Sequence, residues 1–97
     1  MNTKQPFALG QVVATPGALE ALAKAKQSPA DLLARHLRCE WALEAGDVVL
    51  NMAALQDGSR IFGAFILTSG EKIWAITEAV GDDGTRASTC LLMPDEY

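Results

Sequence analysis

The sequence has little of the chemistry on which most small enzymes and metal sites depend. Its 97 residues include one histidine and two cysteines, Cys39 and Cys90. A single histidine cannot complete the Cys/His ligand set of a zinc site, so we expect no metal and no cofactor. Two cysteines do not make a disulfide framework. With Cys39 in a predicted helix and Cys90 in a predicted strand, both are interpreted as buried or half-buried thiols.

Long apolar runs are also missing. None approaches the roughly 18 residues that a membrane span needs. Residues 1–6 lack the apolar segment and cleavage pattern of a signal peptide, so we expect a cytoplasmic protein without a membrane partner. With 49% hydrophobic residues the chain can still bury a core. We therefore predict a single domain over residues 1–97, with residues 1–10 as a loosely ordered lead.

Basic residues are scarce in the second half of the chain. Residues 1–46 hold five Lys/Arg against four Asp/Glu, whereas residues 47–97 hold three against eight, which together give the net charge of −4. This acidic bias makes nucleic acid an improbable partner because phosphates would be repelled. A local acidic patch of Asp82, Asp83, Asp95 and Glu96 would suit docking onto a basic protein surface.

The most informative stretch that is present runs from residue 60 to residue 77. Two runs rich in β-branched and aromatic residues flank Ser69-Gly70, which predicts a β-hairpin. Both faces of its first strand are apolar, so we expect a central strand or a second face covered by a partner. Residues 88–93 predict a third strand, which ends at Pro94.

Three helices are predicted upstream of this hairpin. Thr15 and Ser28 are N-caps, each followed by proline, for helices over residues 18–27 and 30–41. Asp47 is a plausible cap for a third helix over residues 48–56, which Gly58 closes. The expected core sides are Leu19, Leu22 and Ala23 in the first helix and Val49, Met52, Ala53 and Leu55 or Gln56 in the third. Residues 11–15 form at most a short extended segment.

These elements predict an α+β fold. Two or three helices would pack on one face of a three-stranded antiparallel β-meander. The opposite face would use Phe62, Ile66, Trp74 and Ile76 either to pair two copies into a homodimer or to bind a protein partner. Alternatively, the third helix and the region of Trp41 would cover it.

Only one set of residues is a candidate for catalysis. His36 is the sole proton shuttle near neutral pH, and Arg38, Glu78 and Arg86 could complete a phosphodiester-cleaving site around it. The competing interpretation places His36 at the edge of the apolar stripe of its helix, with the arginines in solvent. The acidic second half would repel RNA, which favours this second interpretation.

Several segments together carry a resemblance to a known family. They are residues 10–22, Arg35-His36 followed by Trp41, residues 57–60, residues 73–79 and residues 91–97. The chain resembles a family of short bacterial proteins carried by plasmids, phages or integrated elements, some of which are labelled as type I restriction subunits. Similar proteins have Gly-Asp-Trp where this chain has Cys39-Glu40-Trp41, and they also differ over residues 78–88. The order of helices and strands is similar to that of barnase- or colicin-like ribonuclease toxins.

The resemblance and the residue patterns lead to one functional hypothesis and one alternative. The hypothesis is a small, acidic, non-catalytic accessory protein of a mobile genetic element that binds another protein. Its sharpest form is an inhibitor of a host defence complex, an anti-CRISPR or antirestriction protein. The expected binding residues are Phe62, Ile66, Trp74, Ile76, Asp82 and Asp83. The alternative is a small metal-independent ribonuclease toxin that uses His36, Arg38, Glu78 and Arg86.

Overall fold

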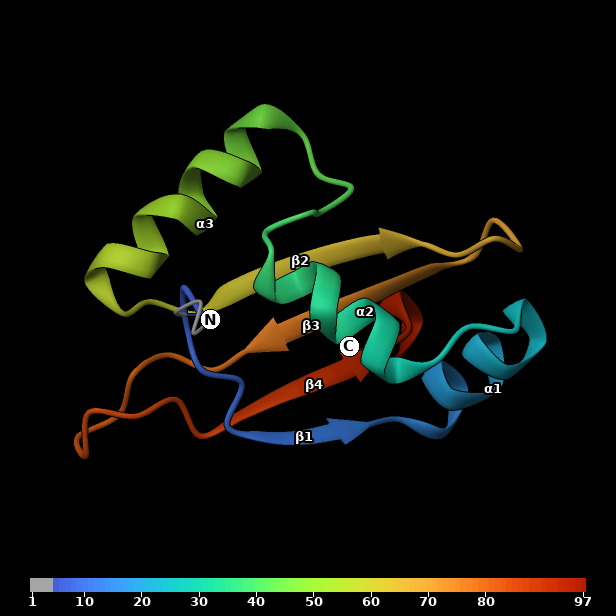
Figure 1. Cartoon of the computed structure of the whole chain (residues 1–97), viewed down its shortest axis with the longest axis horizontal. Coiled ribbons are helices and arrows are strands. Elements are labelled where there is room, and N and C mark those ends of the chain that lie inside the picture. The colour runs from blue at the N-terminus through green and yellow to red at the C-terminus, as the bar shows by residue number, and fades with distance from the viewer. Residues whose placement is uncertain (1–4) are drawn as a thin grey trace, which may run out of the picture.

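The computed structural model describes residues 5–97 and has an α+β architecture (Figure 1). Its elements in chain order are β1 (Gln11–Ala14), α1 (Pro16–Ala25), α2 (Pro29–Leu37), α3 (Ala45–Asp57), β2 (Ile61–Ile66), β3 (Lys72–Thr77), β4 (Ser88–Leu92) and a short 3-10 helix, η1 (Pro94–Glu96). Among the described residues, no helix combines the length and apolar character that crossing a membrane requires.

The sheet has four strands in the order β1-β4-β3-β2. The antiparallel β2-β3-β4 meander is as predicted, but the expectation of three strands was incomplete. Residues 11–14 pair in parallel with β4, with Gln11 opposite Ser88. This pairing joins residues far apart in the sequence, so no local turn signal could predict it.

The helix starts follow the predicted caps. Thr15 Oγ1 accepts a hydrogen bond from the Ala18 N–H at 3.1 Å, and Ser28 Oγ accepts one from the Asp31 N–H at 3.2 Å. At the end of α3, Gly58 takes the left-handed conformation with φ of 81°. Each of these is a local interaction that the sequence specifies directly.

The end of α2 and the start of α3 differ from the prediction. The α2 helix stops at Leu37 because Cys39 is left-handed, with φ of 60°, and the Glu40 N–H donates back to the Arg35 carbonyl at 2.9 Å. Cys39 and Trp41 therefore lie in the connection after α2 rather than in the helix. At α3 the N-cap is Glu44, and Asp47 lies in the first turn.

Helices α1 and α2 cover one face of the sheet, which we call the covered face. Their buried residues join the inward residues of the strands in the main core: Ala18, Ala21, Leu22, Leu32, Phe65, Leu67, Ile73, Ala75 and Leu91. The predicted core side of α1 was therefore wrong in part. Leu22 is buried, but Leu19 is 48% exposed and Ala23 is exposed, since the small residues Ala18 and Ala21 let the helix approach the sheet closely.

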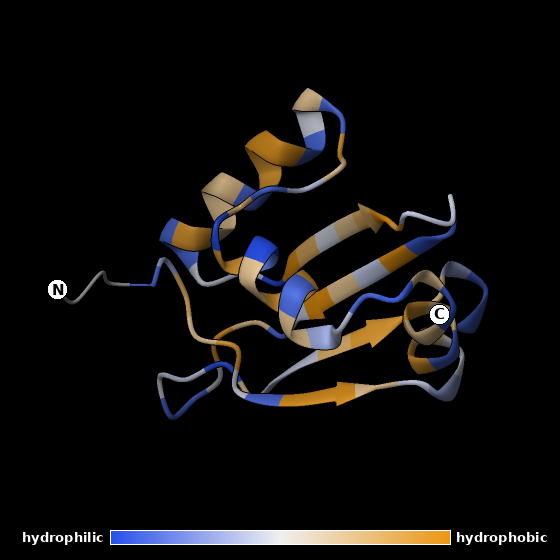
Figure 2. Ribbon diagram, turned by 45° about the vertical axis from the view of Figure 1, so that its right-hand side comes forward, coloured by the Kyte–Doolittle hydropathy of each residue, from blue (hydrophilic) through white to orange (hydrophobic). Residues whose placement is uncertain are grey.

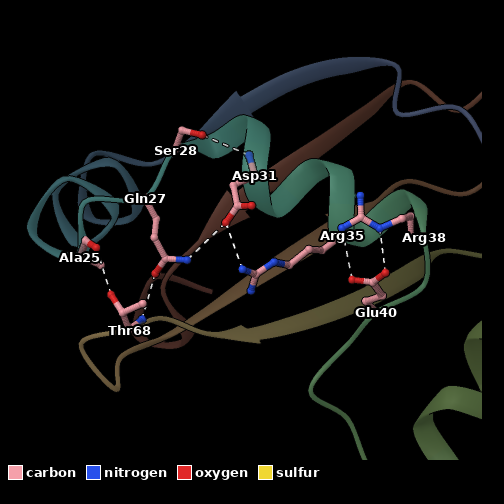
Figure 3. Close-up of polar contacts among 8 residues, drawn as sticks. All are labelled: Ala25, Gln27, Ser28, Asp31, Arg35, Arg38, Glu40 and Thr68. Carbon is pink, nitrogen blue, oxygen red and sulfur yellow. Dashed lines mark hydrogen bonds and ion pairs between the residues drawn. The ribbon is translucent and has the colours of Figure 1, made fainter.

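Polar contacts hold the α1–α2 junction to the tip of the hairpin (Figure 3). Thr68 donates its hydroxyl to the Ala25 carbonyl at 3.0 Å and its N–H to Gln27 Oε1 at 2.9 Å. Gln27 also donates to Asp31, which pairs with Arg35 at 3.3 Å. These contacts fix where the two helices lie across the sheet.

The α3 helix lies beside the outer edge of β2 rather than over a face. Ala54 packs with Ile61 and Phe7 in a second cluster, and Asn51 is buried. The predicted core residues Val49, Met52 and Ala53 are exposed instead, because the edge of a strand offers backbone groups rather than an apolar surface. Phe7, within the predicted lead of residues 1–10, is buried; residues 1–4 lie outside the described residues.

Candidate functional site

The second sheet face carries the predicted hydrophobic binding residues together. Phe62 lies opposite Ile76, and Trp74 lies between Ala64 and Leu92. Because side chains alternate across a strand, these residues and Ile66 share the face opposite α1 and α2. We define the uncovered face by Phe62, Ala64, Ile66, Trp74, Ile76, Cys90 and Leu92. Of these residues, Ile66 is exposed, Phe62, Trp74 and Cys90 are half-buried, and Ala64, Ile76 and Leu92 are buried.

An aromatic cluster occupies the uncovered face. The Phe62 and Trp74 rings pack edge-on with centroids 4.8 Å apart, and Tyr97 packs on Trp74 at 5.7 Å. Arg60 donates to the Tyr97 hydroxyl at 3.1 Å. Tyr97 remains 68% exposed and Ile66 55% exposed. Aromatic residues and arginine are the residue types that dominate protein-binding energetics.

Tyr97 and Arg60 were missed by the sequence analysis as site residues. Tyr97 reaches the uncovered face because η1 turns the chain back onto β3, and Arg60, just before β2, donates to its hydroxyl. Glu96 anchors this turn by accepting hydrogen bonds from the Thr15 hydroxyl at 2.5 Å and from the Met93 N–H at 2.8 Å. These bonds, that from Thr15 first, hold the pKa of the Glu96 carboxyl below its usual range. The only sequence signal was Pro94, which predicted the end of the strand but not the path of the residues after it.

A groove of about 360 Å³ continues this surface between α3 and β2. Phe62 and Arg60 belong to both. Its lining is Asp47, Leu50, Asn51, Ala53, Ala54, Asp57, Ser59, Arg60 and Phe62. Hydrogen bonds from Ser59 lower the pKa of Asp57, so its carboxylate is charged at neutral pH. The groove can accept an apolar side chain next to a basic one.

The two predicted aspartates lie elsewhere. Asp82 and Asp83 are exposed in the β3–β4 loop, which extends beyond the ends of the strands (Figure 1). Asp83 accepts hydrogen bonds from the Thr85 N–H at 2.9 Å and the Thr85 hydroxyl at 2.8 Å, which lower its pKa. The structure thus gathers the four predicted apolar residues on one face and places the acidic pair in a separate loop.

His36 lies in a buried chain of hydrogen bonds on the covered face. The Trp41 indole N–H donates to His36 Nδ1 at 2.8 Å, and His36 Nε2 lies 2.9 Å from Thr77 Oγ1. Thr77 Oγ1 lies 2.7 Å from Thr89 Oγ1, and Thr89 donates to the Leu9 carbonyl at 2.8 Å. His36, Thr77 and Thr89 are fully buried.

The direction of every hydrogen bond in this series from Trp41 to Leu9 follows from the groups at its two ends. An indole N–H can only donate, so His36 Nδ1 carries no proton and the neutral ring holds its proton on Nε2. That proton is donated to Thr77. Thr89 uses its single hydroxyl proton on Leu9, so Thr77 must donate to Thr89. All the groups are satisfied when His36 is neutral, and burial lowers its pKa from 6.5 to about 4.

A glycine makes the contact between His36 and Trp41 possible. A Cβ at Gly63 in β2 would lie 2.6 Å from His36 Nδ1 and 2.7 Å from Trp41 Cδ1. Any other residue at this position would therefore push the imidazole and indole rings off the sheet.

The four residues of the nuclease hypothesis do not come together. His36 is enclosed, with both ring nitrogens hydrogen-bonded. Arg38 is exposed and pairs with Glu40 at 2.7 Å (Figure 3), and Glu78 is exposed after β3. In the part of the chain described, no group of three His, Cys, Asp or Glu residues is placed to hold a metal ion.

Arg86, the fourth of these residues, has a structural role. It is buried and donates to three backbone carbonyls, those of Ser59 at 2.7 Å, Glu78 at 3.0 Å and Ala54 at 3.1 Å. The Ala54 carbonyl lies in the last turn of α3, where a cation is favourable. Arg86 therefore ties α3 to both neighbouring loops, and backbone carbonyls accept three of its five N–H donors.

Comparisons of the chain with protein-family models, with curated proteins and with solved structures found no match in any of the three.

Proposed function

We propose that this chain is a small non-catalytic accessory protein that works in the cytoplasm by binding another protein. The observation that carries the proposal is the apolar and aromatic surface of the uncovered face, over which none of the three α-helices packs. An exposed apolar surface rimmed by polar groups is typical of protein interaction sites. Trp74 and Tyr97 supply the aromatic anchors, and Arg60 lies at their rim.

The residues that line the groove indicate which side chains a partner would place there. Asp47 and Asp57 border it, and Leu50 and Phe62 form apolar walls. A partner segment that inserts an aliphatic or aromatic side chain, with a lysine or arginine beside it, fits this lining. The excess of acidic residues in the second half of the chain favours the same basic partner.

The most specific form of the proposal is an inhibitor of a host defence complex, encoded by a plasmid, phage or integrated element. It is supported by the resemblance of residues 10–22 and 91–97, among others, to short proteins of such elements. Defence complexes that bind nucleic acid expose basic grooves, which an acidic partner can occupy. The nuclease alternative gains no support from the geometry, because His36 is buried in a satisfied hydrogen-bond chain.

The proposal is tested by replacing one exposed residue on each side of the molecule. Tagged wild-type chain and its Ile66→Arg and Leu19→Arg variants are used to capture proteins from the host, with identification by mass spectrometry. We expect Ile66→Arg to weaken binding of a recovered partner by at least about tenfold, which is about 1.4 kcal/mol. Leu19→Arg, a similarly exposed position on α1, should bind as the wild type does.

A functional assay accompanies the capture. Hosts with an active CRISPR or restriction system express each variant, and phage plating efficiency is counted. The defence-inhibitor form predicts that the wild type and Leu19→Arg raise plating and Ile66→Arg does not. Equal capture by both arginine variants, or RNA cleavage by the purified chain, would refute the protein-binding proposal.

A further inference from the structure

The two edges of the sheet differ in whether their outward backbone groups are hydrogen-bonded. At the β2 edge, Asn51 donates to the Phe62 carbonyl at 2.6 Å and accepts from the Phe62 N–H at 3.0 Å. The Ala42 N–H donates to the Ala64 carbonyl at 2.8 Å. These bonds occupy both backbone groups of Phe62 and the carbonyl of Ala64, so the first part of this edge is blocked to a further strand.

The β1 edge is open. The N–H groups of Gln11 and Thr15 donate to the carbonyls of Ala87 and Leu91 in the parallel ladder with β4. By the alternation of a strand, Val12 and Ala14 direct their N–H and C=O groups away from β4. No other segment among residues 5–97 pairs with them, and Figure 2 shows β1 along the border of the sheet with no element beyond it.

The side chains of β1 do nothing to protect this edge. Residues 11–14 include no charge and no proline, the devices that usually block an edge strand. Val12 and Val13 are 42% and 43% exposed, one on each face. A neutral, β-branched edge with free backbone groups favours the addition of a strand that is also neutral and extended.

The uncovered face runs continuously to this edge. The register places Phe62, Ile76, Cys90 and Val13 opposite one another in a single apolar row across all four strands. At its β1 end the row stops at Val13, whose side chain is partly exposed. A second strand with an apolar residue opposite Val13 would extend it.

We propose that β1 pairs with β1 of a second copy, antiparallel and about a twofold axis at Val13. In this register Val12 of each copy exchanges two hydrogen bonds with Ala14 of the other, and the two Val13 residues meet as a non-hydrogen-bonded pair. The partner's own edge supplies matching donors, acceptors and neutral side chains. The result is an eight-stranded sheet in which the two uncovered faces form one surface.

A proline substitution tests the backbone pairing. The Val12 N–H is not used within the chain, so Val12→Pro should keep the fold but remove two intermolecular hydrogen bonds and block the edge. Two four-residue strands bury less than the roughly 1,200 Å² of a stable complex, so the dimer is expected to be weak. Sedimentation equilibrium from about 10 µM to about 1 mM should show the 10.3 kDa wild-type chain shifting toward twice its mass, and Val12→Pro staying monomeric.

Val12→Thr, which keeps the N–H and the branched shape, is the matched control and should dimerise. Circular dichroism and thermal melting check that each variant is folded. Monomeric wild type over the whole range, or dimerisation unchanged in folded Val12→Pro, would overturn the proposal. If the natural partner of the β1 edge is instead a strand of a different protein, the wild type would stay monomeric over the whole range.

Cross-linking tests the register independently of any effect of proline on folding. A non-hydrogen-bonded antiparallel pair has Cα atoms about 4.5 Å apart, within the range that a disulfide spans. In a background with Cys39→Ser and Cys90→Ser, Val13→Cys should oxidise to a covalent dimer, whereas Leu19→Cys should not. Equal cross-linking at both positions would contradict the pairing. Ile66→Arg separates the two proposals, because it should impair partner capture and leave dimerisation unchanged.

Discussion

The covered face of the sheet buries His36, Thr77 and Thr89 completely, whereas the uncovered face leaves Ile66 more than half exposed. The covered face thus holds polar side chains in the dry interior, and the uncovered face holds aromatic side chains near water. Each inverts the usual placement of polar and apolar residues. The two faces therefore differ in role: the buried hydrogen-bonded residues define one arrangement of the helices, and the apolar surface is the one that we propose binds a second protein.

The buried polar residues of the covered face all have hydrogen-bond partners in only one arrangement. In the part of the chain described, every buried side-chain nitrogen or oxygen has a hydrogen-bond partner. Removing one member would leave another unpaired in a fully buried site, which costs about 1–3 kcal/mol. Truncating Ile66, the exposed residue of the uncovered face, has no such consequence, because water replaces the lost contact.

Gly63→Ala should have the largest effect on the covered face. Its Cβ would lie 2.6 Å from the His36 ring, so overpacking and the broken Trp41–His36 bond together should cost about 4 kcal/mol of the free energy of unfolding. Urea denaturation measures this. The control is Gly46→Ala in α3, which meets no atom within 4 Å and should be neutral or stabilising by up to about 1 kcal/mol. Equal stabilities for the two variants would disprove the close contact.

The pH dependence of stability should be the next largest effect. Burial lowers the pKa of His36 in the folded chain to about 4 from 6.5, so between these values the unfolded chain binds the proton and the folded chain does not. Stability is therefore complete above about pH 6.5, falls as the pH drops toward 4, and changes no further through this group below that. The full loss is about 3 kcal/mol, since one pKa unit is worth about 1.4 kcal/mol.

Urea denaturation at a series of pH values from 7 to 4.5 measures this loss. His36 is the only histidine, so a His36→Gln chain should be less stable at pH 7 but should show a much flatter profile over the same range. A wild-type profile as flat as that of the variant would show that His36 is solvated.

The two tryptophans give the smallest and most direct comparison of the faces. Trp41→Phe removes the donor to His36 Nδ1 and should cost about 1–3 kcal/mol. Trp74→Phe keeps an aromatic ring against Phe62 on the uncovered face and should change the free energy of unfolding by less than about 1 kcal/mol. Thermal melts of both variants measure the difference. Similar losses would mean that the indole N–H of Trp41 contributes little.

Sequence reasoning succeeded where the governing interactions are local. The caps at Thr15 and Ser28, the left-handed Gly58 and the hairpin around Gly70 each depend on a few neighbouring residues. Strand alternation alone placed Phe62, Ile66, Trp74 and Ile76 on one face. It could not say which face the helices cover.

Apart from the end of α2 and the N-cap of α3, which are local, the failures were decided by contacts between distant segments. In α3, Val49 and Met52 matched a core pattern, yet Asn51 and Ala54 face the sheet because the helix meets the edge of β2. His36 suited both a catalytic and a core interpretation. Only Trp41, Thr77 and Gly63, from three other segments, determine which of its nitrogens holds the proton.

The sequence by itself therefore determined the helices, the hairpin with its following strand, and the existence of an apolar second face, because propensity, capping and alternation act over a few residues. Tertiary structure alone decided that β1 joins β4, that Arg86 binds three carbonyls and that Tyr97 folds onto Trp74. These contacts join segments far apart in the chain. Their free energy depends on which groups are left buried and unpaired once the whole chain has packed.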